Sequence, residues 1–312
     1  MDIHINNSFS IIENKKTKAI AEEIMKIIFL VCAFFAVLAV FSITIYMILN
    51  GTPAILKIGL KEILFETQWA PTADPKYGIL YVILTSIVGT TFAVLIGVPI
   101  GVLTAVFIAE VAPKQLAAIV KPAVELLAGI PSVIYGLLGI MILNPFMYKI
   151  EKIIFKGSST HQFTGGSNLI SAIIVLAIMI LPTVINISES SIRAVPREMR
   201  SASLALGASK IQTIFKVVLP VARSGIMSAI VLGVGRAIGE AMAITLVSGS
   251  SVNLPLPFNS VRFLTTAIVA EMGYAADEHR QVLFTIGLIL FFFIMVVNTV
   301  FAKLLSTNEK EK

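Results

Sequence analysis

Six blocks of apolar residues, each long enough to cross a lipid bilayer, are the feature that most limits how this chain can fold. The blocks cover residues 24–49, 78–110, 115–148, 168–190, 221–249 and 281–305. A transmembrane helix needs about 20 consecutive apolar residues, and inside a bilayer the backbone must satisfy its own hydrogen bonds, as a helix does. We therefore expect an all-α polytopic membrane protein with six transmembrane helices. The second and third blocks exceed a straight span, so tilt or breaks are expected there.

The composition excludes a soluble domain. The chain is 57% hydrophobic and only 13% charged, with a mean hydropathy of +0.93, whereas soluble domains carry about 25% charged residues. The single Cys32 rules out a disulfide framework, and the three histidines lack metal-ligand spacing. We expect neither metal nor cofactor. The net charge of +6 is explained by basic residues at the membrane edges, not by nucleic-acid binding.

The distribution of lysine and arginine predicts the orientation in the membrane. With the N-terminus inside, cytoplasmic segments hold fifteen of these residues, outer segments hold eight, and the twenty-fourth is Arg236. Cytoplasmic segments carry the excess of positive charge in membrane proteins. We therefore expect both termini in the cytoplasm, with a cytoplasmic tail over 1–23, a six-helix transmembrane domain over 24–305 and a second tail over 306–312. The first block is too long for the core of a signal peptide, so we expect it to be retained.

The predicted outer segment contains an amphipathic stretch, "AILKIGLKEILFETQW", over residues 54–69. Its leucines and isoleucines recur at helical spacing. It predicts an interfacial helix anchored by Trp69. The alternative is a docking surface for an extracellular partner.

Glycines and prolines are placed inside three of the apolar blocks. They are Gly97, Pro99 and Gly101 in the second block, Gly129 and Pro131 in the third, and Gly235 and Gly239 in the fifth. Small residues four apart let helices approach closely in lipid. A glycine–proline break at membrane depth is tolerated only against protein or a water-filled cavity. Two interpretations stay open: tight helix packing, or the discontinuous helices of transporters.

The longest predicted cytoplasmic loop, residues 191–220, reads as a helix, a glycine turn and a second helix. Pro196 suits a first turn, and residues 197–206 form an amphipathic helix. Gly207 suits a C-terminal cap, and Ser209 with Gln212 forms a capping box. Such a unit either lies on the membrane surface or fits a groove on a cytoplasmic partner.

Two charges interrupt the fifth block in "GVGRAIGEAMAITLV". Arg236 and Glu240 are four residues apart, so in a helix they share one face. A charge at the bilayer centre costs at least about 2.5–3.5 kcal/mol, so both must face protein or a water-filled cavity. They form either a salt bridge that fixes helix packing or an anion pathway, because arginine suits a tetrahedral oxyanion. In a pathway, Glu240 is either a latch for Arg236 or an acceptor for a proton that the oxyanion carries. Glu125 in the third block is a weaker candidate.

Motifs for chemistry are missing from the sequence. It has no Gly-Lys dipeptide and so no phosphate-cradling ATP loop, and no G-x-S-x-G, CxxC or HExxH motif. We therefore expect a transport subunit that is not an enzyme and that takes its energy from a partner.

The run "SASLALGASKIQTIFKVVLP" resembles the coupling loop of ABC-transporter permeases. Gly207-Ala208 stands at the family's glycine turn and Leu219-Pro220 at its Leu-Pro ending, while Ser201-Ala202-Ser203 replaces the family's Glu-Ala-Ala. The resemblance implies that these residues dock onto an ATPase subunit. The missing glutamate puts the polar anchoring of that docking in doubt, and Glu198 or Arg200 could replace it.

Three further strings narrow the resemblance. "ELLAGIPSVIYGLLGI", "GVGRAIGEAMAITLVSG" and "TTAIVAEMGYA" look like the PstC-type permease subunits of phosphate-specific ABC transporters, across residues 69–303. That family implies an ABC-importer permease (MetI-like) architecture in the inner cell membrane, with Arg236 and Glu240 in phosphate translocation. It also implies four partners besides lipid: a sister permease, a dimer of ATP-binding subunits, a periplasmic or extracellular phosphate-binding protein, and inorganic phosphate.

Other functions remain as alternatives. The chain could be the sister permease of such a system, or a permease for another oxyanion such as sulfate or molybdate. An ion channel would conduct without ATP, and a membrane scaffold would conduct under no condition.

Overall fold

A computed structural model describes the backbone of residues 3–72 and 75–310, and the side chains of 21–72, 75–300 and Lys303. By internal contacts the chain divides into two compact units, residues 1–50 and 51–312. Helix α1 (Ile3–Ile58) contains the first unit and continues into the second. Most apolar side chains of residues 24–49 are exposed, as expected for a helix whose solvent is lipid.

The described part of the second unit consists of helices, the loops that connect them and one short β-hairpin. Its elements are the end of α1, α2 (Leu60–Phe65), β1 (Trp69–Ala70), β2 (Lys76–Tyr77), α3 (Leu80–Val106), α4 (Lys114–Ala128), α5 (Ser132–Leu138), α6 (Asn144–Ile154), α7 (Leu169–Arg193), α8 (Arg197–Ala205), α9 (Lys210–Thr213), α10 (Leu219–Gly239), α11 (Met242–Val247), α12 (Leu264–Glu271) and α13 (Asp277–Lys310). A π-helical turn, η1 (Phe107–Val111), extends the end of α3, while η2 (Gly139–Leu143) joins α5 to α6 and η3 (Ile214–Val218) joins α9 to α10. The antiparallel strands pair Trp69 with Tyr77.

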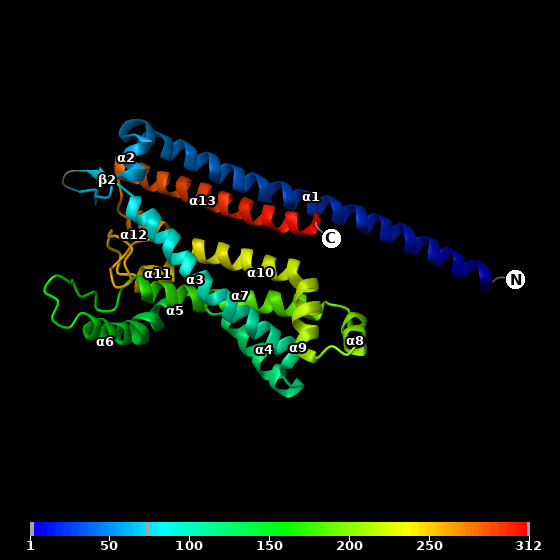
Figure 1. The fold of residues 1–312 in the computed structure, drawn as a ribbon. Coiled ribbons are helices and arrows are strands. Elements are labelled where there is room, and N and C mark those ends of the chain that lie inside the picture. The colour runs from blue at the N-terminus through cyan, green and yellow to red at the C-terminus, as the bar shows by residue number, and fades with distance from the viewer. Residues whose placement is uncertain (1–2, 73–74, 311–312) are drawn as a thin grey trace. The chain divides into compact units, whose positions relative to one another are not determined.

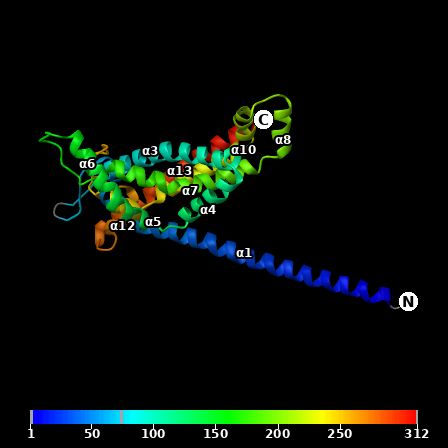
Figure 2. The ribbon, with the colours of Figure 1, turned by 90° about the horizontal axis from the view of Figure 1, so that it is seen from below.

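Among the residues that the structure describes, six helical stretches are long and apolar enough to cross a membrane, as the sequence predicts. They are Ala21–Ile58, Leu80–Val111, Ser132–Ile154, Leu169–Arg193, Lys210–Gly239 and Asp277–Val300. Within the second unit, α8 lies at one end and α6 and α12 lie toward the opposite end (Figures 1 and 2). The spans therefore separate α8 from the loops around α6 and α12.

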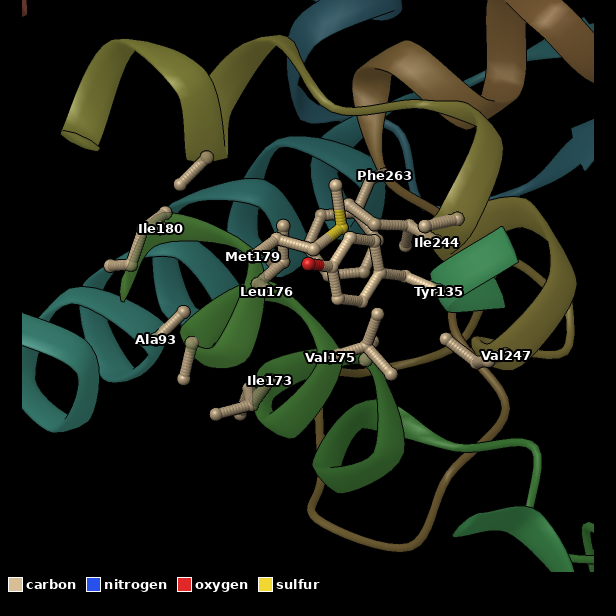
Figure 3. Packing of buried hydrophobic residues seen from close by; sticks show 14 of the residues in the cluster. Ala93, Tyr135, Ile173, Val175, Leu176, Met179, Ile180, Ile244, Val247 and Phe263 are labelled. Carbon is tan, nitrogen blue, oxygen red and sulfur yellow. The ribbon is translucent and has the colours of Figure 1, made fainter. Parts of the chain in front are cut away.

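Helix α7 is the centre of the second unit. In its most apolar window 61% of the residues are buried, against 33% or less in the other spans. It packs along α3 and α10 (Figure 1). Its inner residues, including Leu176, Met179 and Ile180, form the main apolar core with Phe263 and with Ile244 of α11 (Figure 3).

Glycines allow α3 to approach α7 closely. A Cβ atom at Gly97 would lie 2.7 Å from Cδ1 of Ile180 and 3.0 Å from the carbonyl oxygen of Ala177, and one at Gly101 would lie 2.8 Å from Cγ1 of Val184. Pro99 lies between them inside α3 without breaking the helix. Helices α3 and α7 are therefore packed as closely as small residues four positions apart permit.

Several boundaries differ from the sequence prediction. Residues 54–69 do not form one interfacial helix: α1 ends at Ile58, α2 covers Leu60–Phe65, and Trp69 lies in a strand. The reason is Gly59, whose φ of +99° no helix accommodates. The third block is divided, since α4 ends before Gly129 and the span begins at Ser132. The fifth span begins at Lys210, so the second half of the predicted loop 191–220 belongs to that span.

We predict that Gly97→Val destabilises the folded chain by about 1–3 kcal/mol, because the new methyl groups have no room between α3 and α7. The midpoint of thermal unfolding in detergent measures the effect. Gly235→Val is the matched control, since a Cβ there meets nothing within 4 Å. Equal losses in the two variants would show that close packing at Gly97 is not what holds α3 to α7.

Candidate functional site

The two charges of the fifth block lie on either side of a helix break. Helix α10 ends at Gly239, and Glu240 follows it in an extended conformation with φ −71° and ψ 131°. The predicted single helix through Arg236 and Glu240 is therefore wrong, although Arg236 does lie in the last turn of α10. The apolar run continues past the break, so the sequence periodicity does not reveal it.

The carboxylate of Glu240 is hydrogen-bonded to the start of α11 and does not pair with Arg236. Its Oε1 accepts a hydrogen bond from the backbone N–H of Ala243 at 3.0 Å, and its carbonyl oxygen accepts one from Thr265 Oγ1 at 2.6 Å. Breaking a helix leaves backbone donors and acceptors without intrahelical partners. Here the carboxylate and the threonine hydroxyl supply two of those partners.

Arg236 forms no ion pair and no side-chain hydrogen bond with any residue that the structure describes. The predicted salt bridge with Glu240 is thus absent from this conformation. The side chain of Arg236 is half-buried. A cation in a span without a carboxylate partner is suited to meet an anion from outside the chain.

A second break lies between α4 and α5, at the predicted Gly129–Pro131. Gly129 ends α4, and Pro131 precedes the first residue of α5. The hydroxyl of Tyr135 donates to the carbonyl oxygen of Leu127 at 2.8 Å and so bridges the break. Tyr135 is buried in the main core (Figure 3). Sequence analysis did not single it out, because an aromatic residue in an apolar run carries no distinct signal.

The two short helices that follow the breaks pack against each other. A Cβ atom at Gly136 of α5 would lie 2.7 Å from Leu246 and 2.9 Å from Cα of Ala243 in α11, and Gly139 lies against Val247. The residue numbers increase together along both helices, so α5 and α11 run parallel. The two helix breaks consequently lie at a similar level, one turn or less from Tyr135 and Arg236.

Gly235 and Gly239 do not pack against another helix of the described chain, because a Cβ at either would meet nothing within 4 Å. In α10 the close contact with α7 is made by Gly233, where a Cβ would lie 3.0 Å from Val184. Gly235 and Gly239 form a face of α10 that has no side chains, lies beside Arg236 and is not covered by any residue that the structure describes. Helix packing within this chain is therefore not their role.

Glu125 is separate from these charges. It is exposed on α4 and lines a cleft of about 560 Å³ together with Lys114, Lys121 and Arg193. The structure therefore groups Glu125 with the basic side chains of α4 and α7.

The helix–turn–helix of residues 197–213 matches its predicted local structure. Helix α8 covers Arg197–Ala205, Gly207 has a φ of +88°, and Ser209 and Gln212 make both hydrogen bonds of a capping box. A groove of about 770 Å³ runs along this unit, lined by Ala202, Ser203, Leu206, Ala208, Gln212 and Pro220 among others. Ser201 is exposed on α8, and Leu219 and Pro220 continue the helix into α10 in place of closing the loop.

Ion pairs at the α8 end of the second unit were missed by sequence analysis. Glu189 accepts hydrogen bonds from Lys121 Nζ at 3.0 Å and from Nε of Arg193, and Glu110 pairs with Arg200 at 2.9 Å. The spacing of Glu189 and Arg193, four apart near a helix end, was a usable signal. The ion pairs that join segments distant in the sequence, such as Glu110 with Arg200, left no signal in the sequence.

Comparison with known proteins gives a consistent match. The family model described as binding-protein-dependent transport system inner membrane component matches residues 97–308. The probable ABC transporter permease protein YqgH of Bacillus subtilis (strain 168) is 37% identical over 297 residues, covering 92% of this chain and 93% of that protein. The phosphate transport system permease protein PstC of Xylella fastidiosa (strain 9a5c) is 33% identical, covering 93% of each chain. PstC of Pasteurella multocida (strain Pm70) is 33% identical, covering 80% of this chain and 81% of that protein.

Solved structures agree on the fold. A chain of the MetNI methionine ABC transporter in an inward-facing conformation superposes with a TM-score of 0.52 at 20% identity, covering 74% of this chain and 94% of that one. A chain of a bacterial alginate ABC transporter gives a TM-score of 0.54 at 16% identity, covering 86% and 92%. At these identities the likeness concerns the fold alone.

We predict that Tyr135→Phe lowers the stability of the folded chain by about 1 kcal/mol, the usual worth of a hydrogen bond in a membrane protein. The reason is the loss of the bond across the α4–α5 break. Chemical unfolding in detergent micelles measures it. Tyr148→Phe is the control, since its ring contacts persist and its hydroxyl bonds to no residue that the structure describes. A loss of equal size in the control would contradict a special role for the Tyr135 hydroxyl.

Proposed function

Because the chain belongs to the family of inner membrane components of binding-protein-dependent transport systems, we propose that it is the subunit through which an ATP-driven importer carries inorganic phosphate. The chain is an ABC-importer permease and a multi-pass protein of the inner membrane. The observation that supports phosphate is the name shared by relatives about 33% identical over most of the chain, phosphate transport system permease protein PstC.

The proposed assembly has three kinds of protein partner. A sister permease completes the channel as a heterodimer, a dimer of ATP-binding subunits hydrolyses ATP in the cytoplasm, and a phosphate-binding protein delivers the anion from outside. The groove along α8 and α9, with Ser203, Gly207 and Ala208, is the proposed contact with the ATPase. Both termini are placed in the cytoplasm by the lysine and arginine bias.

Arg236 is the proposed phosphate contact within the membrane. Its guanidinium can donate two parallel hydrogen bonds to a tetrahedral oxyanion. It has no carboxylate partner among the described residues, and it lies beside the open glycine face of α10. The adjacent breaks of the α4–α5 and α10–α11 segments give the chain two points at which helices can bend, as alternating access requires.

Glu240 is proposed to act by positioning α11. Its carboxylate accepts from Ala243 N–H, so it fixes the geometry of the break that follows Arg236. This role differs from a latch that binds Arg236 and from an acceptor of the phosphate proton. A glutamine can preserve the hydrogen bond but neither of the other two functions.

We predict that Arg236→Gln lowers phosphate uptake by roughly 10–100-fold, the loss of hydrogen bonds to a charged group. Uptake of labelled phosphate by the reconstituted complex measures the effect. The complex should assemble and hydrolyse ATP normally, because Arg236 contacts no described element of the docking face. Normal uptake in an assembled Arg236→Gln complex would refute the translocation role.

The identity of the anion is tested with the wild-type complex. We expect unlabelled phosphate to suppress uptake of labelled phosphate and an equal concentration of sulfate to leave it unchanged. The reason lies in the proposed phosphate-binding protein, because a delivery site that pairs with the hydroxyl of monohydrogen phosphate rejects an ion without that donor. Equal suppression by sulfate would favour a permease for another oxyanion, and flux in liposomes without ATPase would favour a channel.

For Glu240, we predict that Glu240→Gln keeps most of the phosphate uptake and that Glu240→Ala loses it. Glutamine retains an oxygen that can accept from Ala243 N–H, whereas alanine leaves that donor unpaired near the break. Uptake and assembly are measured for both variants. If glutamine is as defective as alanine, the negative charge itself is needed, and the latch or proton-acceptor hypothesis is favoured.

A further inference from the structure

We infer that the ion pair between Arg200 and Glu110 is the joint that makes the coupling helix α8 and the end of the second span move as one body. This inference rests on the proposed function, in which α8 contacts the ATPase. It assigns a positioning role to two residues that neither the motif of the loop nor the comparisons single out.

The contacts of Arg200 are directed inward. Its Nε and Nη2 donate to Oε1 of Glu110 at 3.1 and 2.9 Å, its Nη1 donates to the carbonyl oxygen of Val195 at 2.5 Å, and Nη2 also donates to that of Ile192 at 2.8 Å. One guanidinium thus connects α8, the turn between α7 and α8, and the π-helical turn η1. The Arg200 and Glu110 side chains are only 21% and 13% exposed, so water weakens the pair less than it weakens a surface salt bridge.

The segments joined by this pair rest on an apolar cluster. Val106 at the end of α3, together with Ile192, Val195, Ile214 and Val218 from the segments before and after α8, forms one buried cluster. Apolar contacts of this kind are not directional, so they keep the segments close but allow them to slide. The ion pair adds the directional contact that fixes α8 to η1.

A second set of bonds extends the connection from η1 to α4. The carbonyl oxygen of Ile108 in η1 accepts from Nη2 of Arg193 at 3.2 Å. Arg193 also pairs with Glu189, which accepts from Lys121 of α4 at 3.0 Å. A displacement of α8 is therefore transmitted to the helix that leads into the break at Gly129–Pro131.

The geometry also decides between two substitutes for the missing glutamate of the loop motif. The polar atoms of Arg200 are used within the chain, so it does not anchor the ATPase. Glu198 is exposed on the same helix and makes no side-chain ion pair with a described residue, which leaves its carboxylate free for a partner.

The first test measures phosphate taken up per ATP hydrolysed by reconstituted complexes. We expect Arg200→Gln and Glu110→Gln each to lower this ratio roughly tenfold while the complex still assembles and hydrolyses ATP. The double variant should lose no more than either single variant, because the residues act as a pair. Arg223→Gln removes an exposed charge from α10, outside α8 and its groove, and should leave the ratio unchanged.

A wild-type ratio in Arg200→Gln, or additive losses in the double variant, would overturn the inference. A merely structural role would lower the amount of assembled complex and leave the ratio of the assembled fraction unchanged, which also counts against it. Absence of phosphate uptake by the wild-type complex would instead refute the proposed function.

The second test does not depend on which anion is carried. Spin labels at Leu103 of α3 and Leu204 of α8, both exposed, are introduced into a Cys32→Ser background of the assembled complex. We expect their distance to stay the same between the nucleotide-free and vanadate-trapped states, and to change between those states in Arg200→Gln. A distance that changes as much without the substitution as with it would show that α8 and the second span are not joined by the pair.

Discussion

A charge that leaves water must meet an opposite charge or several hydrogen-bond donors, and the arrangement of this chain follows from that requirement. Among the described residues three charged side chains are buried, Glu151, Glu189 and Glu271. Glu189 joins α4 to the end of α7, Glu271 joins β1, α12 and α13, and Glu151 holds the loop before α7 through His161 and Thr164. Each carboxylate stabilises contacts between segments, because losing one partner would leave a buried charge unpaired.

Helix α7 is the buried helix between the two ends of the second unit at which these carboxylates form their ion pairs. Its small and branched side chains pack against the glycines of α3, and its last turn carries Glu189 and Arg193. The apolar core therefore fixes the spans laterally, while ion pairs fix the segments near α8. The two kinds of contact have different roles because they differ in directionality. Apolar contacts are insensitive to orientation, whereas a guanidinium–carboxylate pair sets both distance and angle.

Local patterns in the sequence predicted what local physics determines. Six spans, the capping box of Ser209 and Gln212 and the break at Gly129–Pro131 each depend on residues within a few positions of one another. At Gly239 the sequence left both helix packing and a helix break open, because the contact that stabilises the break comes from Thr265, 25 residues away, and because the apolar run continues through it. The pairing of Arg236 with Glu240 was wrong for the same reason: the four-residue spacing implies a shared face only while the helix is continuous.

The α4–α5 break and the α10–α11 break lie at a similar level, and together they affect the surroundings of Arg236. Since α5 and α11 pack in parallel through Gly136 and Gly139, bending at one break must displace the other short helix as well. Arg236 belongs to α10, before its break, while Tyr135 belongs to α5, after the other break. Relative motion of the paired short helices therefore changes the surroundings of the arginine without moving its own helix. In the proposed role of Arg236, this placement allows the arginine to lose or gain contact with an anion while its helix stays packed on α7.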